Sequence, residues 1–141
     1  MTVAQLLLLP AFGHVALVMV TAARMGRGRV HAVRSGQVKL PDVELDPSKW
    51  PMGLRTLSNH YRNQFELPVL YYAVLALLLA TNLADGVAIV LSWAFVGTRI
   101  VHSLIHTGGN VVIHRFYAFL AGFACLALLW AWFGIRLFLI G

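Results

Sequence analysis

Four apolar runs, each long enough to cross a lipid bilayer, constrain this chain more than any other feature. We place them at about residues 3–23, 57–81, 86–106 and 115–140. A helix of about 20 residues covers ~30 Å of hydrocarbon. Charged residues make up 11% of the chain, whereas a soluble domain carries about a quarter. The sequence predicts an all-α fold, a four-helix bundle integral to the membrane, forming a single domain over residues 1–141.

The basic residues indicate the orientation. Seven of the 11 lysines and arginines fall between the first two runs, at Arg24, Arg27, Arg29, Arg34, Lys39, Lys49 and Arg55. The short turn at 82–86 has Asp85 and no basic residue. The positive-inside rule therefore places the 24–56 loop and the 107–114 link in the cytoplasm, with both termini outside. This charge predicts contact with anionic lipid and not with nucleic acid.

Two segments are expected to depart from straight helices. The 24–56 segment begins basic, ends acidic and rich in proline, and has no apolar periodicity, so we expect an irregular, partly ordered loop after Arg24. Pro68 lies within the second run, where it is expected to kink the helix.

Polar side chains follow one stripe on each of the two middle helices. The spacing i, i+3, i+4, i+7 places such residues on one helical face. The second helix has this spacing at Asn59, Arg62, Asn63 and Glu66, and the third has it at Arg99, His102, Ser103 and His106. Arg24 ends the first run and Arg115 opens the fourth. All four helices are thus expected to present polar groups at one depth, toward the cytoplasm.

The charges in this polar layer do not balance. Glu66 is the only acidic residue in the four runs, with Arg62 and Arg99 as candidate partners. The spare guanidinium groups favour an anionic ligand, since arginine binds carboxylates in a bidentate manner. The alternative is a structural ion pair between Glu66 and Arg99, with the other arginines reaching lipid headgroups.

Metal chemistry is not expected. His102 and His106 have the i, i+4 spacing of many metal ligands, and His60 and His114 could join them from other helices. This spacing alone is a weak signal, so we predict no metal site. Cys125 is the single cysteine, which excludes an intrachain disulfide.

Two motifs resemble the MAPEG family, the membrane-associated proteins in eicosanoid and glutathione metabolism. "NQFELP" supplies Asn63, Glu66 and Pro68, and "RIVHSLIHTGGNVVIHR" supplies the residues from Arg99 to Arg115. The resemblance implies a homotrimer that binds glutathione as co-substrate between subunits near the cytoplasmic face, and a lipophilic small-molecule substrate that enters among the membrane lipids. It assigns glutathione binding to Arg24, Asn63, Glu66, Arg99, His102 and His106. It places Arg115 at the thiol, as the catalytic residue.

Two activities are compatible with this resemblance. The first is a glutathione-dependent transferase or peroxidase of the bacterial inner membrane, with its site toward the cytoplasm. However, Asn59 stands where many catalytic members have arginine, and Leu67 stands where they often have an aromatic residue. Such differences suit the second activity, a non-catalytic MAPEG-like protein that binds lipid or a partner membrane protein through the same cleft.

Overall fold

The computed structural model describes residues 1–140, and every regular element within them is helical. The long helices are α1 (Val3–Arg34), α5 (Gly86–Thr107) and α6 (Val112–Ile135). The second span consists of α3 (Met52–Asn63) and α4 (Leu67–Ala80). The shorter elements are α2 (Leu40–Glu44), the 3₁₀ turn η1 (Pro47–Lys49) and the π-helical stretch η2 (Arg136–Ile140). Four stretches of residues 1–140 are long and apolar enough to cross a membrane, so the predicted all-α fold with four candidate spans is confirmed.

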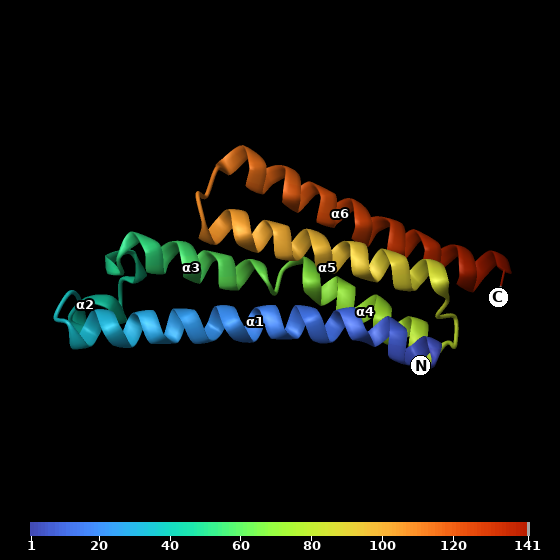
Figure 1. Cartoon of the computed structure of the whole chain (residues 1–141), viewed down its shortest axis with the longest axis horizontal. Coiled ribbons are helices and arrows are strands. Elements are labelled where there is room, and N and C mark those ends of the chain that lie inside the picture. Colours follow the sequence, from blue (N-terminus) through green and yellow to red (C-terminus); the bar gives the residue numbers. More distant parts are fainter. Residues whose placement is uncertain (141) are drawn as a thin grey trace.

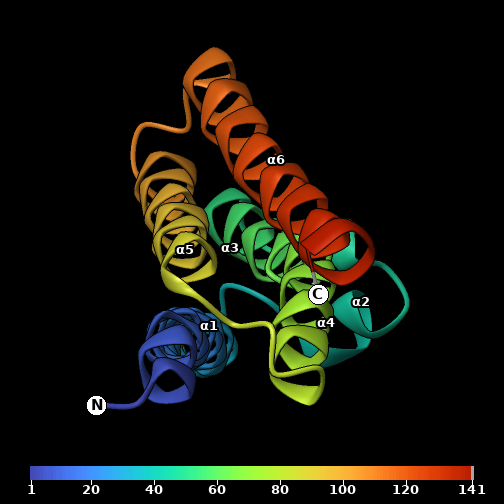
Figure 2. The same ribbon diagram turned by 90° about the vertical axis from the view of Figure 1, so that its right-hand side faces the viewer.

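The helices run side by side along one axis (Figure 1). The N-terminus and the end of α6 lie at one end of the bundle, and α2 and the α5–α6 turn lie at the other. Seen along the axis, α5 lies between α1 and α6 (Figure 2) and contacts both of them. α5 therefore connects α1 to α6 in the protomer.

The main hydrophobic core fills the half of the bundle that contains α4. It is built around the buried side chains Leu7, Tyr71, Leu78, Phe95 and Leu129. Many large apolar side chains on the outer faces of the helices are exposed. In a soluble protein such a surface would favour aggregation, but in a bilayer it faces lipid or other membrane helices.

The first helix is longer than the apolar pattern predicted. α1 continues for ten residues past Arg24, so the expectation of an irregular segment there is wrong. Ala32, Val38 and Val43 form a small second core, against which Trp50 and Leu54 pack. This packing fixes α1, α2 and α3 to one another although the segment is polar. Packing against α3 thus stabilises the extension of α1, and apolar periodicity in the sequence does not indicate this packing.

The loop after α2 is also ordered. The backbone N–H and the hydroxyl of Ser48 donate to Asp46 Oδ1, at 3.0 and 2.6 Å. Both hydrogen bonds lower the pKa of the Asp46 carboxyl, and the bond from the hydroxyl has the larger effect. Asp46 is thereby the N-cap of η1.

The second span is broken and not merely kinked. α3 ends at Asn63, three residues follow, and α4 begins at Leu67 with Pro68 in its first turn. Proline lacks a backbone N–H and its ring clashes with the carbonyl four residues earlier, which here belongs to Gln64. The expected kink at Pro68 is therefore a break centred before it, and the second helix carries no continuous stripe from Asn59 to Glu66.

Candidate functional site

The polar face of α5 is buried inside the protomer. Arg99, His102 and His106 are only 1–3% exposed, and Ser103 lies beside them at 7%. These are the four residues that the spacing predicted to share one face, and that prediction is confirmed. The face lies against α3, which packs on α5.

Arg99 is held by the end of α3. Its Nη2 donates to the backbone carbonyl of Asn63 at 2.9 Å. This carbonyl is free because α3 ends there, and the last carbonyls of a helix attract cations. Within the described part of the chain, Nε and Nη1 of Arg99 are buried without a hydrogen-bond partner. The break before Pro68 therefore creates the acceptor that orients this arginine and leaves two of its nitrogens for another group.

The alternative of a Glu66–Arg99 ion pair is contradicted. Glu66 is exposed at the break. Among residues 1–140 the one ion pair joins Arg136 and Asp85, at 3.2 Å, at the far end of the bundle. The ion pair considered from the sequence assumed one helix that continues through Glu66. Because α3 ends at Asn63, Glu66 does not share a helical face with Asn59 and Asn63.

Three histidines meet between α3 and α5. The ring centroid of His60 lies 6.1 Å from that of His102 and 5.1 Å from that of His106. Nε2 of His60 also lies 2.9 Å from the hydroxyl oxygen of Ser103. The spacing on α5 predicted the pair His102 and His106, and α3 adds His60, which the sequence offered only as one possible companion.

Gln64 is a buried polar residue that the sequence reasoning missed. Its Oε1 lies 3.2 Å from Nε2 of His14, and its Nε2 lies 3.1 Å from Nε2 of His60. His14 in turn lies 2.7 Å from the hydroxyl of Tyr72. A polar network thus runs from α1 through the break to α5. The sequence did contain a signal for this residue. Gln64 is an amide four residues before Pro68, and the proline interrupts the helix at that point and leaves the amide buried.

A pocket opens at the start of α6. It has a volume of about 200 Å³ and its lining includes Asn63, His102, Arg115, Phe116 and Phe119. Nη1 of Arg115 donates to Oδ1 of Asn110 at 2.9 Å and lies 3.4 Å from Nε2 of His106. The pocket therefore combines a guanidinium, an amide and a buried imidazole with an aromatic wall.

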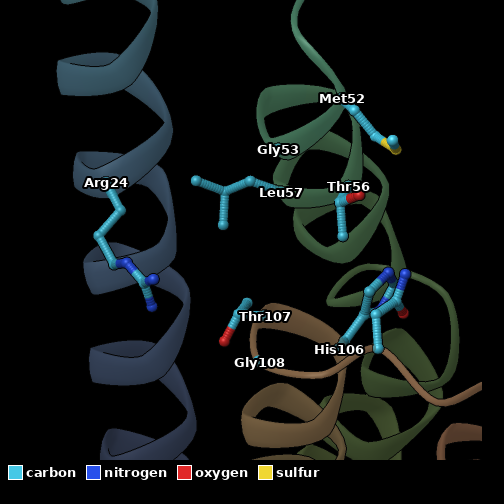
Figure 3. Close-up of a pocket in the computed structure, with 9 residues that line it drawn as sticks. Arg24, Met52, Gly53, Thr56, Leu57, His106, Thr107 and Gly108 are labelled. Carbon is cyan, nitrogen blue, oxygen red and sulfur yellow. The ribbon is translucent and has the colours of Figure 1, made fainter.

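A second pocket lies on the other side of His106, between α1, α3 and the α5–α6 turn. Its volume is about 290 Å³, and Arg24, Thr56, His106 and Asn110 help to line it. The side chain of Arg24 points from α1 toward Thr107 and Gly108 at the end of α5 (Figure 3). Its charge is therefore directed at the C-terminus of that helix.

The structure brings most of the predicted site residues together, in two groups. Asn63, His102 and Arg115 line the pocket at α6, and Arg24 and His106 line the one beside α1. Arg99 lies behind them, bound to Asn63. Glu66 lines neither pocket.

The donor set fits an anion. Arg99, Arg115 and Arg24 supply positive charge, and no carboxylate lines either pocket. Two buried nitrogens of Arg99 and both of His102 have no partner within residues 1–140. Guanidinium forks bind carboxylates and phosphates in a bidentate manner. A small molecule with carboxylate or phosphate groups has the chemistry to match this set.

Comparison with known proteins gives one positive result. The MAPEG family profile matches residues 7–135. No curated protein and no solved structure matches this chain. Since the family match extends from the first core residue of α1 to the end of α6, it covers every residue of both pockets. The chain is an integral membrane protein and belongs to the MAPEG family, the membrane-associated proteins in eicosanoid and glutathione metabolism.

Proposed function

We propose that the chain is a membrane-embedded, glutathione-dependent transferase or peroxidase acting on lipophilic electrophiles or hydroperoxides. The observation that carries the proposal is the place of Arg115, in a pocket with Asn63 and His102 and without a carboxylate. MAPEG members generally use glutathione. Bound glutathione would supply a sulfur nucleophile, and the residues of the two pockets would bind and orient it.

Arg115 would stabilise the thiolate. A free thiol has a pKa of ~8.5 and must ionise to attack. Lowering that pKa by ~2 units takes ~2.7 kcal/mol of preferential stabilisation of the anion. A fixed guanidinium in a site with little water can supply this amount. Arg115 is fixed through Asn110, and the aromatic rings of Phe116 and Phe119 line the same pocket.

The other predicted residues would position the ligand. Arg24 and Arg99 would attract its carboxylates, and Asn63, His102 and His106 would supply hydrogen bonds. Glu66, exposed at the break, would bind the ligand's amine if the site is completed by a neighbouring subunit. We therefore propose a homotrimer, the state general in the family. We also propose a bacterial inner-membrane location with both termini outside, because the basic loop and both pockets then lie on the cytoplasmic side.

Binding of glutathione to the purified protein is the first test of this proposed function. Titration of the purified oligomer with glutathione in a calorimeter is expected to show saturable binding at or below millimolar concentration. An absence of binding at that concentration would rule the proposal out.

Removal of the guanidinium tests the role of Arg115. The Arg115→Ala variant is expected to lower turnover by about 10²-fold or more, with a smaller change in glutathione affinity, because the charge acts on the thiolate. Arg27→Ala is the matched control, since Arg27 is exposed on α1 and lines neither pocket. Equal loss of affinity and turnover in Arg115→Ala would give Arg115 a binding role only.

The second candidate function is binding of an anionic lipid without catalysis. The observation that favours it is the rim beside Arg115, where Val112 and Phe116 are exposed. A headgroup at the guanidinium would leave an acyl chain along these apolar side chains. Mass spectrometry of lipid retained by the purified protein, together with silent transferase and peroxidase assays, would support it. Unchanged lipid retention in an Arg99→Ala, Arg115→Ala double variant would exclude this site.

A further inference from the structure

His60, His102 and His106 form a cluster with the dimensions of a metal site. Each of the three is no more than 3% exposed. One ring nitrogen from each lies within 4.8 Å of the others. His60 comes from α3, and His102 and His106 come from successive turns of α5. The geometry therefore gathers three imidazoles at the contact between two helices.

The cluster has ligand atoms to spare. Both nitrogens of His102 and Nδ1 of His106 are buried without a hydrogen-bond partner among the described residues. Leaving such a group unsatisfied costs about 1–3 kcal/mol. The buried His14 provides a contrast, because both of its nitrogens have partners, Tyr72 and Gln64. A buried histidine in this bundle can thus have hydrogen-bond partners for both ring nitrogens, and His102 differs because neither of its nitrogens has one.

We propose that these three histidines bind a Zn²⁺ ion, with a fourth coordination position open to an exogenous ligand. Neutral imidazole is a preferred zinc ligand, and three protein ligands with one open position is a common zinc arrangement. Ligand nitrogens around tetrahedral zinc lie about 3.4 Å apart. The three ring nitrogens, now within 4.8 Å of one another, would move closer together on binding.

Neighbouring groups orient the proposed ligands. Ser103 contacts Nε2 of His60, and the amide nitrogen of Gln64 lies 3.3 Å from Nδ1 of the same ring. Arg115 contacts Nε2 of His106. Hydrogen bonds to one imidazole nitrogen commonly fix a ring whose other nitrogen binds metal. For His106 the nitrogen left free is Nδ1, the one without a partner. If Nδ1 binds the ion, Nε2 carries the ring proton, so Arg115 would keep its bond to Asn110 and no longer contact this nitrogen.

The charges around the cluster define the fourth ligand. Arg115 touches His106, and Arg99 shares the buried face of α5. Two guanidinium groups repel a divalent cation. An anion on the ion offsets this repulsion, so the open position is assigned to hydroxide or another small anion. The site requires His60, which has no part in the proposed glutathione binding, and it shares His102 and His106 with that proposal. The metal tests below contain no glutathione, so they can fail or succeed separately from it.

Metal content is the first test. The full-length protein in detergent is stripped with a chelator, incubated with Zn²⁺, freed of excess metal and analysed for zinc. We expect one zinc per chain, and Co²⁺ in its place should give the intense visible bands of a four- or five-coordinate ion. Zinc far below one per chain, or only the weak bands of octahedral Co²⁺, would overturn the proposal.

Substitution locates the ion. His60→Gln and His102→Gln are expected to lose the stoichiometric zinc and the Co²⁺ bands. His114→Gln is the matched control, because His114 is exposed on α6 and lies outside the cluster, so it should retain both signals. Full zinc retention in His60→Gln and His102→Gln would place the ion elsewhere and overturn the assignment. If either variant fails to assemble, the Co²⁺ spectrum of the unsubstituted protein still decides.

Discussion

At the scale of single residues, buried polar side chains connect the helices of the bundle in pairs. The hydroxyl groups of Tyr71 on α4 and Ser92 on α5 lie 2.7 Å apart. Both residues are completely buried. In a membrane, where apolar packing alone does not favour one helix neighbour over another, such bonds help to select the pairing.

The Tyr71–Ser92 pair permits a double-variant test. Ser92→Ala is expected to lower the free energy of unfolding by roughly 1 kcal/mol, since the Tyr71 hydroxyl is left buried without its partner. Tyr71→Phe removes the same bond, so the double variant should lose less than the sum of the single losses. Unfolding in detergent micelles measures all three. Strictly additive losses would show that the two hydroxyls are not coupled.

At the scale of helices, α5 and α6 approach each other closely at Gly122. A Cβ atom built there would lie 2.8 Å from Oγ1 of Thr98, which is itself bonded to the carbonyl of Phe95 at 2.6 Å. Real Cβ contacts are essentially never this short. The pairing of the two helices therefore depends on the absence of a side chain at this position.

Gly122→Ala is expected to destabilise the protein by about 1–3 kcal/mol, because Thr98 or the helices must shift. Gly134→Ala on the same helix is the control, since a Cβ there meets nothing within 4 Å. Thermal unfolding of both variants in one detergent provides the comparison. Equal stability of the two would show that the α5–α6 contact relaxes without cost.

Sequence periodicity predicted α5 well and the neighbouring elements less well. The expected run at 86–106 corresponds to α5 at Gly86–Thr107, since its apolar and polar faces are distinct and Asp85 caps it. The extension of α1 depends on contacts with α3, which lies far along the chain. The convergence of His60 on α5 depends on where α3 ends. Local patterns thus determine the elements, and long-range packing determines the site.

At the scale of the whole molecule, α1 is longer than a bilayer is thick. Its 32 residues extend about 48 Å, against ~30 Å of hydrocarbon. Its last turns lie beyond the end of α5, beside α2 and α3 (Figure 1). In the proposed orientation, with both termini outside, this basic end would lie in the cytoplasm next to anionic lipid.

Labelling with a membrane-impermeant maleimide tests this orientation in a Cys125→Ala background. Thr81→Cys, in the turn between α4 and α5, is expected to react in intact spheroplasts. Ser35→Cys, at the end of α1, should react only after the membrane is permeabilised. The opposite pattern would place both termini inside and invert the orientation.

The break between α3 and α4 also bears on how this chain can change in evolution. In a continuous helix, one inserted residue turns everything beyond it by about 100°. Here the chain leaves helical geometry between Gln64 and Glu66, while Arg99 anchors α3 through Asn63. Insertions or deletions at the break can therefore be absorbed without rotating His60 or Asn63 away from α5. The segment at the break can thus change in length while the polar layer between α3 and α5 keeps its arrangement.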